Sequence, residues 1–114
     1  MGISDSLKKG TIELLILKIL TLNDMYGYQM CQEIENRSGE RVTVLEGSLY
    51  PILYRLVERG FVTDRQELVG KRRFRIYYHI TELGVQRGRE LLDEYNQLNE
   101  EIKLIMKSVE EEKQ

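Results

Sequence analysis

Positive charge is concentrated in one short segment of this chain. Lys71, Arg72 and Arg73 follow Gly70 directly, within GKRRFRIYYHIT. Three adjacent cations repel one another, and an anion spread across them relieves that repulsion. Residues 41–80 carry eight Lys or Arg against four acidic residues, although the whole chain has a formal charge of −2. Because charges are screened beyond about 8 Å at physiological salt, the local excess favours phosphate binding. The alternative is a solvated basic hairpin without a ligand.

A second set of polar side chains comes just before, in GSLYPILYRLVERG. The apolar residues of this segment have the spacing of a helical core face: Leu49, Ile52, Leu53, Leu56 and Val57. Ser48, Tyr50, Tyr54 and Arg55 fall outside that face. We predict that these four contact base edges or phosphate oxygens in a DNA groove. The alternative is that the tyrosines only shield the edge of the core.

The elements that position these residues are a helix and a hairpin. We expect Ser48 to be the N-cap, Pro51 to occupy the third helical position, and Arg59 with Gly60 to end the helix. In the second strand of the hairpin, apolar and polar residues alternate, which predicts one buried face: Phe74, Ile76, Tyr78 and Ile80 against Arg73, Arg75, Tyr77 and His79. Gly70 is the expected positive-φ residue of the turn.

Two helices and a short strand are expected to support this unit. The first helix, from Leu7 to Leu22, is apolar around most of its circumference and must be covered on more than one side. Asn23 and Asp24 favour a turn or an N-cap. The second helix spans about 26–37 and ends at Ser38 and Gly39, with one face formed by Tyr28, Cys31 and Ile34. Residues 41–45 are a candidate strand against the hairpin.

A long helix closes the sequence. We expect Thr81 to cap it, Glu82 to lie in its first turn, and its end to fall near Lys107, about 40 Å away. Apolar residues recur at spacings of 4, 3, 4, 3 and 4, as in a coiled-coil seam: Leu91, Tyr95, Leu98, Ile102, Ile105 and Val109. The seam predicts a homodimer, and packing back onto the chain's own domain is the alternative. We divide the chain into a DNA-binding domain (1–81), a dimerisation helix (82–108) and a frayed tail (109–114).

Other classes of protein find little support in the sequence. The single cysteine, Cys31, permits no internal disulfide, and no apolar run is long enough to cross a bilayer. We therefore expect a cytoplasmic protein without a membrane partner. A phosphate-binding glycine loop followed by GK[ST], an HExxH motif and paired cysteines are all missing. His79 is the only histidine, so neither it nor Cys31 is expected to bind a metal. We expect no enzymatic activity and no cofactor.

Three linked motifs, YGYQMCQEI, GSLYPILYRLVERGFV and GKRRFRIYYHITELG, cover residues 8–85 in order. They resemble the signature of the PadR family of bacterial transcriptional regulators, in the form with a single C-terminal helix. The resemblance implies a mainly α fold with a small β-hairpin, a winged helix-turn-helix, followed by a long dimerisation helix. It also implies a homodimeric, ligand-responsive repressor on a palindromic operator of double-stranded DNA, held by the residues of the third helix and the hairpin tip. A winged-helix protein-interaction module remains the alternative.

The resemblance also implies a place for a small effector. Some members of the family bind flat aromatic compounds at the dimer centre, where a tryptophan provides the stacking surface. This chain has no tryptophan. Leu15 and Tyr95 are the residues that we assign to an effector pocket, with Tyr95 as the stacking ring.

Overall fold

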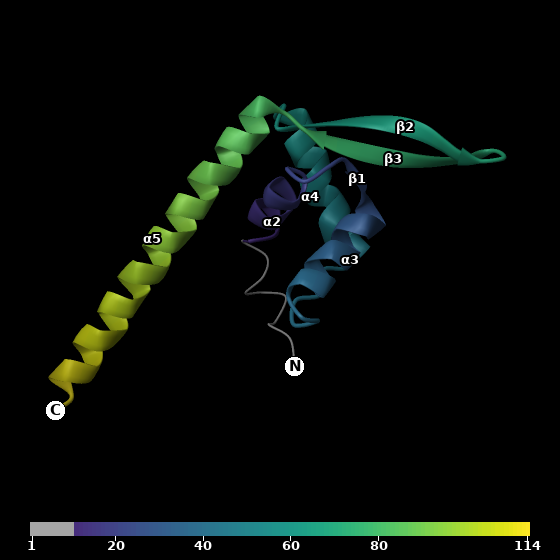
Figure 1. The fold of residues 1–114 in the computed structure, drawn as a ribbon. Helices are drawn as coiled ribbons and strands as arrows, with labels where there is room; N and C mark the ends of the chain where they lie inside the picture. Colours follow the sequence, from purple (N-terminus) through teal and green to yellow (C-terminus); the bar gives the residue numbers. More distant parts are fainter. Residues whose placement is uncertain (1–10) are drawn as a thin grey trace.

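The structure is a computed structural model, and it describes residues 11–114. Its elements are α2 (Ile12–Ile19), β1 (Met25–Tyr26), α3 (Gly27–Arg37), α4 (Glu46–Glu58), β2 (Val62–Gly70), β3 (Arg73–Ile80) and α5 (Glu82–Glu112). The β2–β3 hairpin and α5 leave the helical body on opposite sides (Figure 1). Within the described residues the fold is mainly α with one small antiparallel sheet, as predicted. Leu7, the first residue assigned to the N-terminal helix, lies outside these residues.

The core lies where α2, α3 and α4 meet the base of the sheet. Its fully buried side chains come from all of these elements: Ile16, Leu17, Leu20, Met25, Met30, Leu49, Leu53, Leu56 and Val62. The predicted core face of α4 is confirmed, with Val57 only half-buried. Truncating any one of these large side chains to alanine would cost about 2–5 kcal/mol.

The third strand of the sheet is not the predicted one. Residues 41–45 form no strand, and Met25–Tyr26 pairs with β3 instead, opposite Tyr78 and Tyr77. The strand order is β1-β3-β2. A two-residue strand has no periodicity to detect, because alternation needs several residues to show. Val44 is still buried, but it contributes from a loop.

The start of α3 also differs from the prediction. Tyr26, not Asp24, is the N-cap residue. Tyr28 is 52% exposed, and the buried side of α3 is formed instead by Gly27, Met30, Cys31 and Ile34. The predicted C-terminus is confirmed: Ser38 is the C-cap and Gly39 follows with a φ of +63°.

The predicted N-terminus of α4 is wrong by three residues. Leu45 is the N-cap, its carbonyl accepts from the N–H groups of Ser48 (3.0 Å) and Leu49 (3.1 Å), and no side chain caps the helix. Pro51 is therefore the sixth helical residue, and the carbonyl of Gly47 lacks its usual i+4 donor. Both positions are exposed, so water can hydrate that carbonyl. The predicted end is confirmed: Arg59 is the C-cap, and Gly60 has a φ of +77°.

The first turns of α5 are fixed against the domain. Thr81 caps the helix as predicted, because its Oγ1 accepts from the N–H of Gly84 at 3.1 Å. Gly88 packs on α2, where an added Cβ would lie 3.3 Å from the Cβ of Leu17. The start of α5 thus packs back on its own domain, whereas the side chains beyond residue 91 are exposed, apart from the half-buried Asn99. The helix continues to Glu112, so residues 109–112, predicted to be a frayed tail, are helical.

Candidate nucleic-acid interface

The basic tip of the hairpin is a two-residue turn. Gly70 pairs with Arg73, which leaves Lys71 and Arg72 between the strands. The predicted turn residue is wrong: Arg72, with a φ of +66°, adopts the left-handed conformation, and Gly70 does not. A register shift between Leu68 and Gly70 redirects the strand, so the turn comes later than expected.

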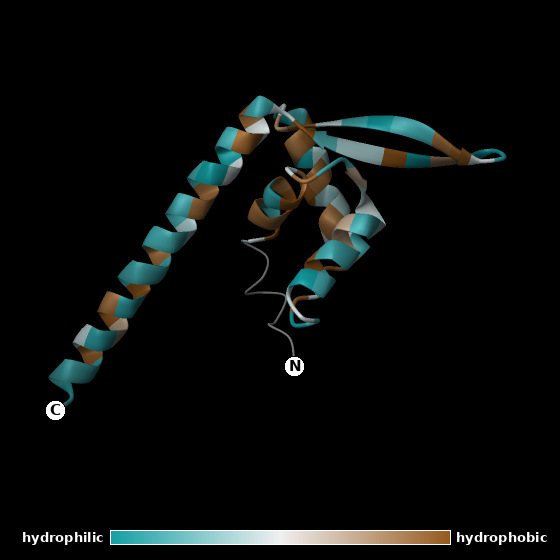
Figure 2. Cartoon of the chain, viewed as in Figure 1, coloured by the Kyte–Doolittle hydropathy of each residue, from teal (hydrophilic) through white to brown (hydrophobic). Residues whose placement is uncertain are grey.

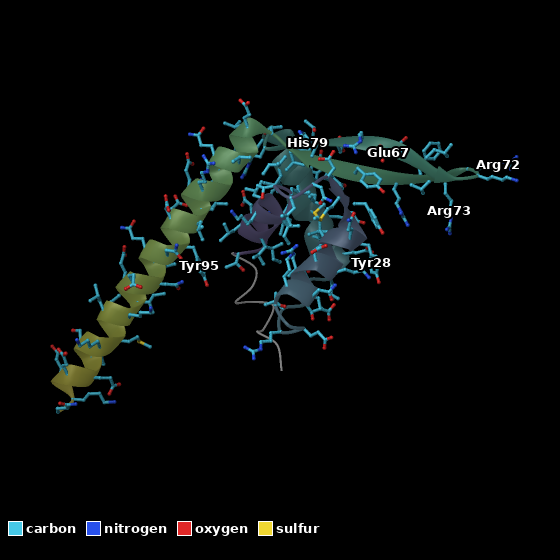
Figure 3. All side chains as sticks on the ribbon, viewed as in Figure 1. Tyr28, Glu67, Arg72, Arg73, His79 and Tyr95 are labelled. Atoms are coloured by element: carbon cyan, nitrogen blue, oxygen red, sulfur yellow. The ribbon has the colours of Figure 1, made fainter. Side chains whose placement is uncertain are left out.

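All three cations of the tip are exposed. Figure 3 shows Arg72 extending beyond the far end of the hairpin and Arg73 just behind it, directed to one side of the hairpin. Within residues 11–114, none of the three forms an ion pair with a carboxylate. The tip is therefore a concentrated positive charge with free N–H donors, suited to phosphate oxygens.

The four predicted α4 residues are all solvent-accessible in the described chain. Ser48 and Arg55 are exposed, Tyr50 is 43% exposed and Tyr54 is 67% exposed. The free phenol of Tyr54 is available to a ligand. The structure thus gathers these side chains on the outer side of one helix, in the same domain as the basic tip.

Tyr50 also has a packing role. Its ring covers the start of α3, where a Cβ added to Gly27 would lie 2.5 Å from the Tyr50 Oη. Partial burial, and then the negative charge of Glu46, raises the pKa of the Tyr50 phenol. Its neutral hydroxyl is retained as a hydrogen-bond donor at physiological pH. The alternative interpretation, that a tyrosine shields the core edge, therefore applies in part to Tyr50 and not to Tyr54.

The base of the hairpin is tied to the helical body by a polar cluster that sequence reasoning missed. The Nδ1 of His79 lies 2.7 Å from Oδ1 of Asp24, and Nη1 of Arg65 lies 2.5 Å from Oδ2 of the same carboxylate. The hydrogen bond from His79, followed by that from Arg65, lowers the pKa of Asp24. Glu67 binds the Nε of Arg65 at 3.3 Å. The cluster links the β2–β3 hairpin, which we call the wing, to the connection between α2 and β1.

Aromatic rings continue this contact on the same side of the sheet. The guanidinium of Arg75 lies 4.2 Å from the ring centroid of Tyr26, and Tyr26 meets Tyr77 edge to face at 5.6 Å. Arg75 was expected only to face solvent. A cation above an aromatic face contributes about 0.5–1 kcal/mol at an exposed site. The proximal half of the hairpin is therefore held against β1 by side-chain contacts as well as by backbone pairing.

The predicted buried face of the hairpin is only partly correct. Tyr78 is buried and Ile80 is half-buried, whereas Phe74 and Ile76 are exposed because the hairpin extends beyond the helices. Alternation along a strand identifies its two faces but does not show how far the neighbouring elements reach.

A groove of about 530 Å³ lies between α2 and α5. Its lining is mainly apolar: Leu14, Leu15, Leu17, Lys18, Thr21, Val85, Gly88, Arg89 and Leu92. Leu15, one of the two predicted effector residues, is in this lining, and Tyr95 is not. Tyr95, Leu98, Ile102, Ile105 and Val109 are exposed along α5, and Leu91 is half-buried against the core.

Residues 11–114 show no arrangement that would form a reactive thiol site, a metal site or a membrane-spanning helix. The thiol of Cys31 is buried, and burial raises its pKa, so the reactive thiolate is disfavoured. No group of three or more His, Cys, Asp or Glu side chains in this range is arranged to hold a metal ion. No helix in the same range combines the length and apolar character needed to span a membrane.

Comparison with known proteins adds independent information. Residues 16–90 match the profile of the transcriptional regulator PadR-like family. The chain is 34% identical over 94 residues to the transcriptional regulator YqjI of Escherichia coli, covering 82% of this chain but 44% of that protein. It is 32% identical over 102 residues to an uncharacterised protein X of Lysinibacillus sphaericus, covering 90% of this chain and 94% of that one.

Solved structures show the same architecture. A transcriptional regulator from Clostridium thermocellum superposes with a TM-score of 0.79 at 27% identity, over 89% of this chain and 95% of that one. Bacillus subtilis PadR, solved in complex with operator DNA, superposes with a TM-score of 0.67 at 24% identity, over 72% of this chain and 46% of that one.

Proposed function

The chain belongs to the transcriptional regulator PadR-like family, and on that basis we propose that it binds operator DNA as a homodimer, with α4 in the major groove and the wing beside it. The observation that carries this proposal is the cationic tip, whose three side chains form no ion pair with any residue of the described range 11–114. The hairpin that carries it contacts the helical body at its base. An unpaired cluster of Lys and Arg is electrostatically costly unless an anion approaches, and DNA phosphates are the anions that a gene regulator meets. The protein would act in the cytoplasm.

The exposed apolar stripe of α5 supports the homodimer. Tyr95, Leu98 and Ile102 are exposed on this helix. Figure 1 shows that α5 leaves the domain after its first turns, and Figure 3 shows Tyr95 on the part beyond it. Pairing this stripe with the same stripe of a second copy removes it from water. Two domains related by twofold symmetry then present two α4 helices to half-sites about 34 Å apart, which fits a palindromic operator.

The groove between α2 and α5 supports regulation by a small, largely apolar effector. It lies where the paired α5 helix of a second copy would pack, so an occupant there would alter the angle between the two domains. Tyr95 lies farther along the same helix, and its ring is the available stacking surface in this tryptophan-free chain. In this proposal the free protein represses, and the effector lowers its affinity for DNA.

Salt dependence of binding to the DNA upstream of the protein's own gene tests the proposal. If each protomer makes three or four phosphate contacts, log affinity should fall with log salt at a slope of about −5 to −7. Footprinting on the same DNA should then show two protected half-sites. Absent or salt-independent binding would favour the alternative, a winged-helix module that binds another protein.

A further inference from the structure

Two large apolar side chains are exposed to solvent just behind the basic tip. Leu68 and Phe74 are opposite one another across the hairpin, and each is 63% exposed. The next residue on that face of β3, Ile76, is also exposed. Figure 2 shows hydrophobic residues, in brown, on both strands next to the hydrophilic tip, in teal. Exposed apolar residues this close together, on an element that projects from the fold, indicate a surface that becomes covered.

The orientation of this apolar face follows from the strand alternation. Phe74 and Ile76 share their side of β3 with Tyr78, because every second residue points the same way. Tyr78 is buried at the base of the hairpin. Leu68 and Phe74 therefore lie on the face of the hairpin opposite to that of Arg73 and Arg75, so a duplex that receives the hairpin would meet apolar side chains on one face and cations on the other.

Charge identifies the occupant. Lys71, Arg72, Arg73 and Arg75 lie at the tip and along β3, next to the apolar pair in the sequence, so a second copy of the same hairpin would be repelled. A DNA duplex offers both complementary surfaces at once, since phosphates line the rim of its minor groove and apolar deoxyribose faces form the walls. The minor groove is about 6 Å wide, narrower than a hairpin with its side chains, so entry requires the walls to separate.

We infer that Leu68 and Phe74 pack against the deoxyribose walls of the minor groove and hold it open while the arginines of the tip reach phosphates and base edges. This inference rests on the proposed DNA-binding function and extends it. The apolar pair supplies a contribution to affinity that does not depend on salt. It also favours flexible, easily widened sequences at positions where no hydrogen bond reads the bases.

The test compares the full-length protein with the Leu68→Ser plus Phe74→Ser variant on a labelled duplex from upstream of its own gene, over a range of salt concentrations. We expect the variant to bind about tenfold more weakly at every salt concentration, equivalent to about 1.4 kcal/mol. The slope of log affinity against log salt should not change, because no phosphate contact is lost. Arg73→Ala is the contrasting variant, and it should reduce the magnitude of the slope.

Matched variants separate this effect from a general one. Leu22→Ser removes another exposed leucine, at the end of α2, and should leave affinity unchanged. Phe74→Leu keeps an apolar side chain and should retain most of the binding. Equal affinity of the double serine variant and the wild type would overturn the inference, as would a change confined to the slope or a change in oligomeric state. Failure of the wild type to bind any duplex would overturn the proposed function as well.

Hydroxyl-radical footprinting gives a second readout that needs no double variant, because the radical attacks deoxyribose from the minor groove. The wild type should protect sugars at the positions reached by the wing. Phe74→Ser should lose that protection while the protection over the α4 half-site remains. If the sugars at the wing position are cleaved equally with and without the wild-type protein, the inference is refuted.

Discussion

Asp24 and His79 are 55 residues apart in the sequence, and their side chains meet at 2.7 Å at the base of the wing. Asp24 belongs to the connection between α2 and β1, and His79 belongs to β3. Together with Arg65, they join the helical body, through the connection between α2 and β1, to the hairpin that carries the basic tip. The orientation of the wing therefore depends on a polar contact at its base as well as on the buried core.

The Asp24 contact should make stability depend on pH. The hydrogen bond from His79, and then that from Arg65, lowers the folded-state pKa of Asp24 below its ordinary value of 3.8. Its contribution is therefore present above about pH 4 and is lost as the pH falls through the lowered value. We expect Asp24→Asn to reduce the melting temperature by about 2–4 °C near neutral pH, as for a good surface ion pair.

Thermal melts at several pH values check this prediction. The difference between wild type and Asp24→Asn should shrink towards zero as the pH drops well below 4. Glu67→Gln is the control, because the ion pair of Glu67 is with Arg65, two residues away on the same strand, and its loss should change the melting temperature less. A difference that does not vary with pH would show that the lost contact is not electrostatic.

Charge reversal at the tip should abolish DNA binding. Lys71→Glu, Arg72→Glu and Arg73→Glu together replace three attractive phosphate contacts by repulsion in each protomer. A gel shift on the DNA upstream of the protein's own gene measures the loss. The far-UV circular dichroism and the melting temperature should remain close to those of the wild type, because all three residues are exposed and form no ion pair within residues 11–114. A normal gel shift for this variant would contradict the proposed interface.

Charges placed on the seam of α5 should separate the dimer. Leu98→Asp plus Ile102→Asp buries two carboxylates in the proposed helix pair, which is unfavourable enough to give monomers in sedimentation experiments. DNA affinity should then fall, because each half-site is bound separately. Asn96→Asp plus Gln97→Asp adds the same charge on the outer side of the helix and should leave a dimer. If the seam variant still sediments as a dimer, the assigned helix face is incorrect.

A methyl group at Gly84 should destabilise the junction between wing and helix. A Cβ at this position would collide with the carbonyl oxygen of Phe61, which is backbone and cannot move aside easily. We expect Gly84→Ala to lower the free energy of unfolding by about 1–3 kcal/mol, as overpacking does. Gly47→Ala is the matched control: it is helical, has no atom within 4 Å of the added Cβ, and should stabilise by about 0.5–1 kcal/mol. Urea denaturation measures both.

Local patterns alone were sufficient to identify several elements. The core face of α4, the cap at Thr81, and the glycines that end α3 and α4 all depend on residues within a few positions of one another. Helix periodicity and capping chemistry are properties of neighbouring residues, so they can be predicted without knowing the fold. The location of the positive charge is also a property of the sequence itself.

Tertiary structure decided which distant residues meet. The strand at Met25–Tyr26, the contact between Asp24 and His79, and the fit of Gly84 against Phe61 each join segments far apart in the chain. The turn at Arg72 followed from the register between β2 and β3, which overrode the preference of Gly70 for positive φ. Register and depth of burial arise when whole elements pack together, and for that reason they are absent from any short stretch of sequence.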